Sequence, residues 1–213
     1  MQFNFSNLNR IKAIVFDLGG VITNINYNLT VEAFRKLGIN DFDKLYGQFK
    51  QTNTFDLFEK GLIEPKRFRD EIRALAGAQI SDEDFDNAWY AMLLDTPKER
   101  IELIQRLRKN FKVYLLSNTN ILHISRHKYN VWKETGIENF ETLFDYPYYS
   151  YTAHMKKPDD EIYLKVLHEN NLKPEETLFI DDTFLNTEAA ERLGIQVYLL
   201  NDGKTINDLF KSY

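Results

Sequence analysis

Polar side chains stand directly after three short apolar runs of the sequence, and their chemical types suit a metal ion and an anion. The runs and the polar residues that follow them are Ile11–Phe16 with Asp17, Lys112–Leu116 with Ser117 and Asn118, and Thr177–Ile180 with Asp181 and Asp182. If the runs are parallel strands, their carboxyl ends meet at one edge of a sheet, where ligands of such folds bind. Carboxylates gathered there repel each other, and a divalent cation relieves the repulsion. Because Mg²⁺ prefers carboxylate, carbonyl and water oxygens, the pattern predicts a magnesium site.

The apolar pattern also predicts the elements that must position these groups. A fourth buried strand is predicted at Ile195–Leu200 and a weaker fifth at Phe140–Phe144, whereas the tyrosine-rich stretch Tyr146–Tyr151 is predicted to be a loop. Segments with helical spacing lie between the strands, at residues 97–107, 158–170 and 185–193. Wholly apolar strands that alternate with helices predict a parallel sheet covered on both faces, which is a Rossmann-like α/β fold.

Nearly a hundred residues separate the first strand from the second, far more than one crossover helix needs. Apolar residues recur at helical spacing over 31–37, 65–76 and 81–92, which predicts helices there. We therefore predict that residues 28–94 form a helical cap subdomain, inserted into an α/β core of residues 1–27 plus 95–213. The hinges between them are expected at residues 24–28 and 94–96.

The composition of the 213-residue chain limits the other functional classes. A hydrophobic content of 43% and a charged content of 28% are ordinary for a globular protein. The absence of cysteine excludes disulfides, thiolate metal sites and a cysteine nucleophile. A net charge of −5 without a basic stripe disfavours nucleic-acid binding, and no apolar run approaches the roughly 20 residues of a membrane helix. We therefore expect a cytoplasmic protein, a monomer or weak homodimer, with neither a nucleic-acid nor a membrane partner.

Four segments together resemble the four motifs of the haloacid dehalogenase-like superfamily, in the same order and at similar spacing. They are FDLGGVI at 16–22, LLSNTN at 115–120, KKPDDEIY at 156–163 and FIDDTFLN at 179–186. The helical insert is similar to the family's cap, and the motifs look most like those of bacterial sugar-phosphate phosphatases, including those for α-glucose 1-phosphate. The resemblance implies an Mg²⁺-dependent phosphatase that hydrolyses a small phosphorylated metabolite, expected to be a sugar phosphate, through an aspartyl-phosphate.

The resemblance also implies which residues carry the chemistry. Asp17 would be the nucleophile that attacks phosphorus. Lys157 would pair with Asp17 and with the phosphate, and so keep the nucleophile ionised beside a dianion. Asp17, the main-chain carbonyl of Gly19 and the carboxylate of Asp182 would bind Mg²⁺.

Further matching positions would hold the substrate and support the metal ligands. Ser117 would hydrogen-bond the phosphoryl oxygens together with the backbone N–H of Asn118 and the ammonium of Lys157. Asp181 would act behind the metal ligands, directly or through water, and Asn186 would orient the loop or line the site. Phosphoryl transfer depends mainly on positioning and charge neutralisation, which this set of groups can supply.

One position departs from the usual phosphatase pattern. The residue two after the nucleophile, commonly an aspartate that protonates the leaving group, is Gly19 here. One reading is a substrate with a better leaving group, such as a sugar 1-phosphate. Another is an acid supplied by the cap, with Asp56, Glu59 and Glu64 as candidates. A third is a catalytically impaired binding or regulatory protein.

Two other functions compete with the phosphatase on sequence grounds. A metal-independent dehalogenase could use the same fold, although the paired acids Asp181 and Asp182 near the nucleophile would then lack a compensating cation. A receiver-type signalling domain also has a parallel sheet with an acceptor aspartate. Such domains are much shorter and have no helical insert, so the chain length disfavours this class.

Overall fold

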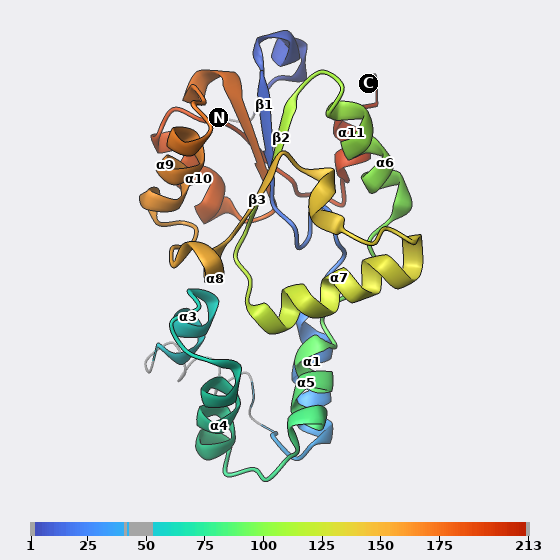
Figure 1. Cartoon of the computed structure of the whole chain (residues 1–213), viewed down its shortest axis with the longest axis vertical. Coiled ribbons are helices and arrows are strands. Elements are labelled where there is room, and N and C mark those ends of the chain that lie inside the picture. The colour runs from blue at the N-terminus through green and yellow to red at the C-terminus, as the bar shows by residue number, and fades with distance from the viewer. Residues whose placement is uncertain (1–2, 41, 43–52, 212–213) are drawn as a thin grey trace.

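A five-stranded parallel sheet forms the centre of the protein (Figure 1). The computed structural model describes residues 3–40, 42 and 53–211. The strands are β1 (Ala13–Phe16), β2 (Lys112–Ser117), β3 (Tyr146–Tyr149), β4 (Thr177–Asp181) and β5 (Gln196–Leu199). Their order is β3-β2-β1-β4-β5, and the central strand β1 pairs Ala13 with Lys112 on one side and with Thr177 on the other. The predicted Rossmann-like α/β fold is confirmed.

The fifth strand lies elsewhere than the sequence predicts. Phe140–Leu143 is a short 3-10 helix, not a strand, because the side chain of Asn139 accepts a hydrogen bond from the Glu141 amide and starts a turn. The strand is Tyr146–Tyr149, within the stretch predicted to be a loop. Pro147 is compatible with a strand here because β3 lies at the edge of the sheet, where a missing N–H is tolerated.

Helices cover both faces of the sheet because successive strand residues point to opposite sides. In β1, Ile14 belongs to one buried cluster and Val15 to the other. The cluster around Ile14 includes residues of α6 (Lys98–Leu107), α7 (Ile121–Thr135) and α11 (Ile206–Leu209). The cluster around Val15 includes residues of α9 (Asp160–Glu169) and α10 (Phe184–Arg192). Figure 1 shows these two groups of helices on either side of the strands.

Short elements complete the α/β part of the fold. They are the 3-10 helices η1 (Phe5–Arg10), η2 (Phe140–Leu143) and η3 (Pro174–Glu176), and the one-turn helix α8 (Ser150–Ala153). The helix α8 follows β3 directly and matters for the site because it faces the cap.

A third buried cluster belongs to the helices inserted between β1 and β2. These are α1 (Tyr27–Lys36), α3 (Thr54–Glu59), α4 (Pro65–Ala76) and α5 (Asp82–Tyr90). Their core is largely aromatic, with Phe68 stacked on Phe58 at 4.0 Å between ring centroids. Residues 41 and 43–52 of the predicted cap lie outside the described residues. The boundaries of the cap at 28–94 stay a prediction.

Local sequence signals account for the ends of two cap helices. The hydroxyl of Ser81 accepts a hydrogen bond from the Asp84 amide and caps the start of α5. Gly77 ends α4 in the left-handed conformation that glycine adopts without steric cost.

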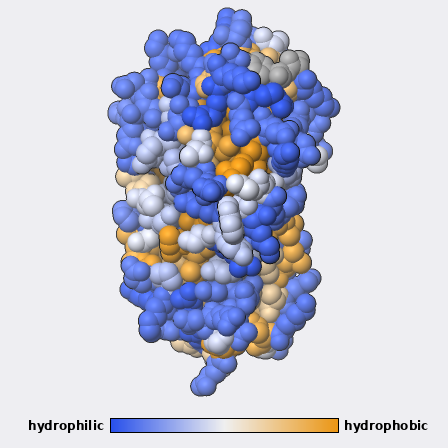
Figure 2. All heavy atoms as spheres, turned by 45° about the vertical axis from the view of Figure 1, so that its right-hand side comes forward, coloured by the Kyte–Doolittle hydropathy of each residue, from blue (hydrophilic) through white to orange (hydrophobic). Residues whose placement is uncertain are grey.

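The face of the protein drawn in Figure 2 is mostly hydrophilic. On this face, hydrophobic atoms gather in small patches between hydrophilic ones. Within the described residues, the structure has no helix that combines the length and the hydropathy required to cross a bilayer.

Candidate active site

Lys157 is the centre of the predicted site and joins two strand ends. Its ammonium donates hydrogen bonds to Asp17 Oδ1 at 2.7 Å and to Asp181 Oδ2 at 2.6 Å. Asp17 directly follows β1, and Asp181 is the last residue of β4. All three are buried, and the Lys157 side chain is only 1% exposed. The fold thus brings together the predicted nucleophile and the predicted lysine, which are 140 residues apart.

The charges of this cluster perturb one another. Burial raises the pKa of Asp17 to about 7, the Lys157 ammonium opposes the rise, and the carboxylates of Asp181 and Asp182 add to it. Burial also acts against the charge of Lys157, but the two carboxylates in contact outweigh it and raise the pKa of the lysine. Lys157 therefore stays protonated, and further negative charge nearby would raise the pKa of Asp17 still more.

Asp181 has its carboxylate oxygens fully engaged by protein groups. Oδ1 accepts from the Thr183 amide at 2.8 Å, and the Asn186 side-chain amide lies 3.1 Å from both oxygens. Oδ2 also accepts from Lys157. Tyr163 in turn donates its hydroxyl to the Asn186 carbonyl at 2.9 Å. The Thr183 amide and the Asn186 side chain thus hold the carboxylate that contacts Lys157.

Asp182 lies beside this cluster and is exposed. One ligand atom from each of Asp17, Asp181 and Asp182 lies within 4.8 Å of the others. Desolvation and the neighbouring carboxylate of Asp181 raise the pKa of Asp182. Three hard oxygen donors this close, two of them with raised pKa values, form a donor set that fits Mg²⁺.

The loop after β1 is shaped by a close approach between Gly20 and Asp182. Gly20 has φ +78°, and a Cβ at this position would lie 2.1 Å from Asp182 Oδ2. Glycine is therefore required here both by its backbone conformation and by the space that the Asp182 carboxylate fills.

We expect Gly20→Ala to lower the free energy of unfolding by about 2–5 kcal/mol, because it adds a steric clash to left-handed backbone strain. Gly38→Ala is the matched control, since Gly38 also has positive φ but an added Cβ would meet no described atom within 4 Å. The control should lose only about 1–2 kcal/mol. Urea unfolding of both variants measures the difference, and equal losses would show that Asp182 does not occupy this space.

Ser117 and Asn118 lie at the end of β2, as predicted. Ser117 is the last residue of the strand and is buried. The Asn118 side chain pairs with the backbone of Lys157, donating to its carbonyl at 2.8 Å and accepting from its amide at 2.9 Å. Asn120 begins α7, and its side chain accepts from the His123 amide. The positive end of a 15-residue helix thus lies next to the predicted phosphate-binding residues.

The structure gives Asn118 a function that sequence reasoning missed. Only its backbone N–H is predicted to act, toward the phosphate, whereas its side chain holds the segment that carries Lys157. No sequence signal distinguishes these uses, because the partner backbone is 39 residues away. Asn118 is therefore a positioning residue for Lys157.

The cap contacts the lysine-bearing loop directly. Lys156, the neighbour of Lys157, forms ion pairs of 2.8 Å with Asp56 and with Glu59 of α3. A Cβ on Gly61 would lie 2.1 Å from the Tyr151 carbonyl oxygen, so cap and core backbones touch here. Partial burial opposes ionisation of Asp56, but hydrogen bonds and charge from Lys156 and Lys60 outweigh it and lower its pKa. Asp56 is thus a carboxylate and a poor proton donor at neutral pH.

Two histidines of α7, the half-buried His123 and the buried His127, connect this helix to the rest of the fold. His123 Nε2 lies 2.9 Å from the Trp89 carbonyl, and its ring stacks on the Trp89 indole at 4.6 Å. His127 Nε2 lies 2.7 Å from the hydroxyl of Thr23, in the loop after Gly19 and Gly20. Burial lowers the pKa of each histidine to about 4, so both rings are neutral at pH 7. They act as packed hydrogen-bonding groups at the contacts of α7.

Comparisons with known proteins agree on one family. The family model described as haloacid dehalogenase-like hydrolase matches residues 11–194. The D-ribitol-5-phosphate phosphatase of Bacteroides thetaiotaomicron is 33% identical over 193 residues, which cover 91% of this chain and 93% of that protein.

Solved structures agree with this result. The HAD-family enzyme BT-2542 of Bacteroides thetaiotaomicron, in complex with magnesium and inorganic phosphate, has 37% identity and a TM-score of 0.86, covering 94% of this chain and 99% of that one. A predicted HAD-like family hydrolase from Porphyromonas gingivalis has 28% identity and a TM-score of 0.85, covering 95% and 97%. The chain therefore belongs to the haloacid dehalogenase-like hydrolase family, as its four motifs predict.

Proposed function

We propose that this phosphatase of the haloacid dehalogenase-like family hydrolyses the phosphate monoester of a small metabolite, with Mg²⁺ as cofactor and Asp17 as nucleophile. The observation that carries the proposal is the buried contact of Lys157 with both Asp17 and Asp181, next to the exposed carboxylate of Asp182. The relative that was crystallised with magnesium and inorganic phosphate supports the same cofactor and substrate group.

Asp17 would attack phosphorus in line, forming an aspartyl-phosphate while the bond to the alcohol oxygen breaks. Lys157 opposes the rise that burial causes in the pKa of Asp17. It would also face the developing charge on the phosphoryl oxygens. Ser117 and the start of α7 provide hydrogen-bond donors on the side of β2. Water then releases phosphate and regenerates Asp17. When bound, Mg²⁺ would supply the positive charge that allows a dianion to approach this acidic cluster.

The proposed metal ligands are Asp17, the carbonyl of Gly19 and Asp182. Two features support Asp182 over Asp181 as the ligand from β4. Asp181 is buried and committed to Lys157, Thr183 and Asn186, whereas Asp182 is exposed toward the nucleophile loop. Asp181 is then the group that orients Lys157.

Gly19 supplies no side-chain acid for the leaving group. A Cβ here would lie 3.0 Å from Ile25 Cδ1, the end of a flexible side chain that has to shift for any larger residue. Of the candidate cap acids, Asp56 and Glu59 are both paired with Lys156. The proton for the leaving alcohol is therefore proposed to come from water, which favours esters with good leaving groups such as sugar 1-phosphates.

The sequence predicts a sugar phosphate, and the D-ribitol-5-phosphate phosphatase relative supports a polyhydroxylated alcohol. The lining of the cavity under the cap, described below, favours an alcohol with fewer hydroxyl groups. A dehalogenase remains the competing chemistry, but it would leave three clustered carboxylates with Lys157 alone and no metal ion, which would be costly. Hydrolysis of phosphate monoesters that EDTA abolishes and Mg²⁺ restores would separate the two.

Asp182→Asn tests the metal assignment. We expect the Mg²⁺ concentration for half-maximal activity to rise at least about tenfold, because a charged ligand is lost. The stabilisation of the fold by Mg²⁺, measured as a shift in Tm, should fall in parallel. Glu188→Gln is the matched control, an exposed acid on α10 that removes the same charge elsewhere. An unchanged magnesium dependence in Asp182→Asn would contradict the assignment.

A further inference from the structure

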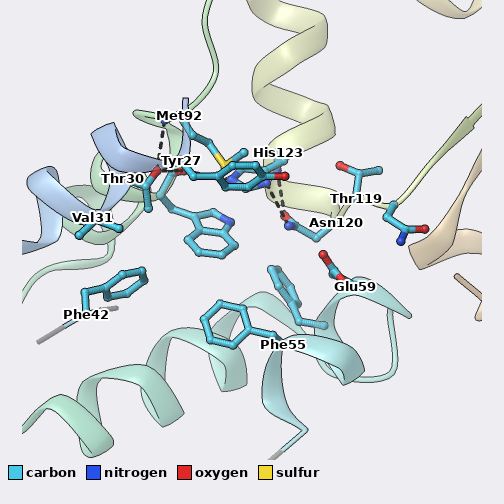
Figure 3. A pocket seen from close by; sticks show the side chains of 13 residues that line it. Tyr27, Thr30, Val31, Phe42, Phe55, Glu59, Met92, Thr119, Asn120 and His123 are labelled. Atoms are coloured by element: carbon cyan, nitrogen blue, oxygen red, sulfur yellow. Dashed lines mark hydrogen bonds between the residues drawn. The ribbon is translucent and has the colours of Figure 1, made fainter. Parts of the chain in front are cut away.

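A cavity of about 440 Å³ lies where the cap meets the core (Figure 3). Its size falls within the range of sites that enclose small organic ligands. A smaller cavity of about 60 Å³ is lined by Gly19 and Ser117 of the proposed phosphate site. The two cavities share five lining residues, which are Tyr27, Met92, Asn118, Thr119 and His123. The larger cavity thus begins beside the phosphate site, where the alcohol part of a bound ester would extend.

The walls of the larger cavity change in character along its length. Figure 3 shows Val31 and Phe42 at one end and Thr119 and Asn120 at the other, with Phe55 between them. Apolar side chains dominate the described lining, and those from the cap core are almost fully buried, such as Phe58 at 2% and Phe42 at 3% exposed. The polar end faces the core, and the apolar end extends into the cap.

Most polar side chains of the described lining are already paired within the protein. The Thr30 hydroxyl donates to the Trp89 carbonyl and accepts from the Met92 amide. Asn120 pairs with His123, and His123 also contacts the Trp89 carbonyl.

The same holds nearer the phosphate site. The side-chain nitrogen and oxygen of Asn118 both form hydrogen bonds with the Lys157 backbone. Glu59, the charged residue of the described lining, is neutralised by Lys156 at 2.8 Å. By contrast, the indole N–H of Trp89 is buried without a hydrogen-bond partner among the described atoms. That N–H is itself closed to solvent, so the described walls offer few hydrogen bonds to a ligand.

We propose that this cavity selects phosphate monoesters whose alcohol has a hydrophobic body. The proposal rests on the phosphatase function proposed above and narrows its substrate class. A polyol such as ribitol carries a hydroxyl on every carbon, and each one that enters these walls loses water without gaining a partner. A hydrocarbon body loses nothing comparable and gains from leaving water.

Three esters of primary alcohols test the proposal: 2-naphthylmethyl phosphate, D-ribitol 5-phosphate and methyl phosphate. Their leaving groups are similar in kind, so differences in kcat/KM report the organic body. We expect kcat/KM for the naphthylmethyl ester to exceed that for the ribitol ester at least about tenfold, through the burial of apolar surface. The free alcohol 2-naphthylmethanol should also inhibit competitively, which needs no variant.

Val31→Thr changes polarity at nearly constant shape and should lower the preference for the naphthylmethyl ester over methyl phosphate about three- to tenfold. Leu75→Ala, at an exposed position of α4, should leave the preference unchanged. Equal or better turnover of the ribitol ester would overturn the hydrophobic substrate class and leave the phosphatase intact. Failure to hydrolyse any of the three or α-glucose 1-phosphate, with no phosphorylation of Asp17, would overturn the proposed function itself.

Discussion

Asp17→Asn should lower kcat/KM by about 10⁵-fold or more, because the amide cannot attack phosphorus and no other described carboxylate shares its position at the end of β1. Rapid acid quench with a ³²P-labelled ester should trap an acyl-phosphate in the wild type and none in the variant. The fold should persist, because Asn has nearly the same shape and Lys157 keeps its hydrogen bond to Asp181.

The control for this prediction is Asp145→Asn, at an acid near the opposite end of β2 from Ser117, where it contacts Lys112 and the Val113 amide. That variant should retain the labelling of the wild type. Turnover by Asp17→Asn within tenfold of the wild type, after repeated purification, would exclude Asp17 as the nucleophile.

Lys157→Met should damage both catalysis and stability, because it leaves two buried carboxylates without their cation. We expect kcat/KM to fall about 10³-fold, by the usual cost of removing a charged group aimed at the developing charge. The free energy of unfolding should fall by about 3–5 kcal/mol, as when one partner of a buried ion pair is removed.

Lys156→Met is the matched control, with the same substitution one residue earlier. The ion pairs of Lys156 with Asp56 and Glu59 are partly exposed, with 23% of the lysine side chain accessible. Each such pair contributes about 0–1 kcal/mol, so the control should lose far less stability. Chemical denaturation and steady-state kinetics of both variants are required. If Lys157→Met and Lys156→Met lost similar amounts of unfolding free energy, burial would not strengthen the ion pairs of Lys157.

The sequence predicts most of the sheet because four of its strands are short, apolar throughout and followed by turns or polar residues. It misplaces the edge strand β3, since Phe140–Phe144 and Tyr146–Tyr149 are both rich in aromatic residues and differ mainly in local capping by Asn139. Pattern alone does not show that a proline-containing segment lies at a sheet edge.

The candidate site was predictable where single residues follow single strands. Asp17, Ser117, Asp181 and Asp182 lie at or directly after strand ends, as predicted, whereas Lys157 lies in a turn and is predicted by the motif resemblance alone. The pairing of Asn118 with the Lys157 backbone and the cavity under the cap depend on contacts between distant segments, which spacing does not encode. The roles of the site residues, the cap boundaries, the cytoplasmic location and the oligomeric state stay predictions.

The close approach of Gly20 to Asp182 limits how this protein can evolve. An acid at position 182 and any side chain at position 20 compete for one volume, so position 20 cannot gain a side chain while the acid stays in place. A lineage that acquired a larger residue after the double glycine would have to give up the acid or rebuild the loop. Variation at these two positions should therefore be inherited as a pair.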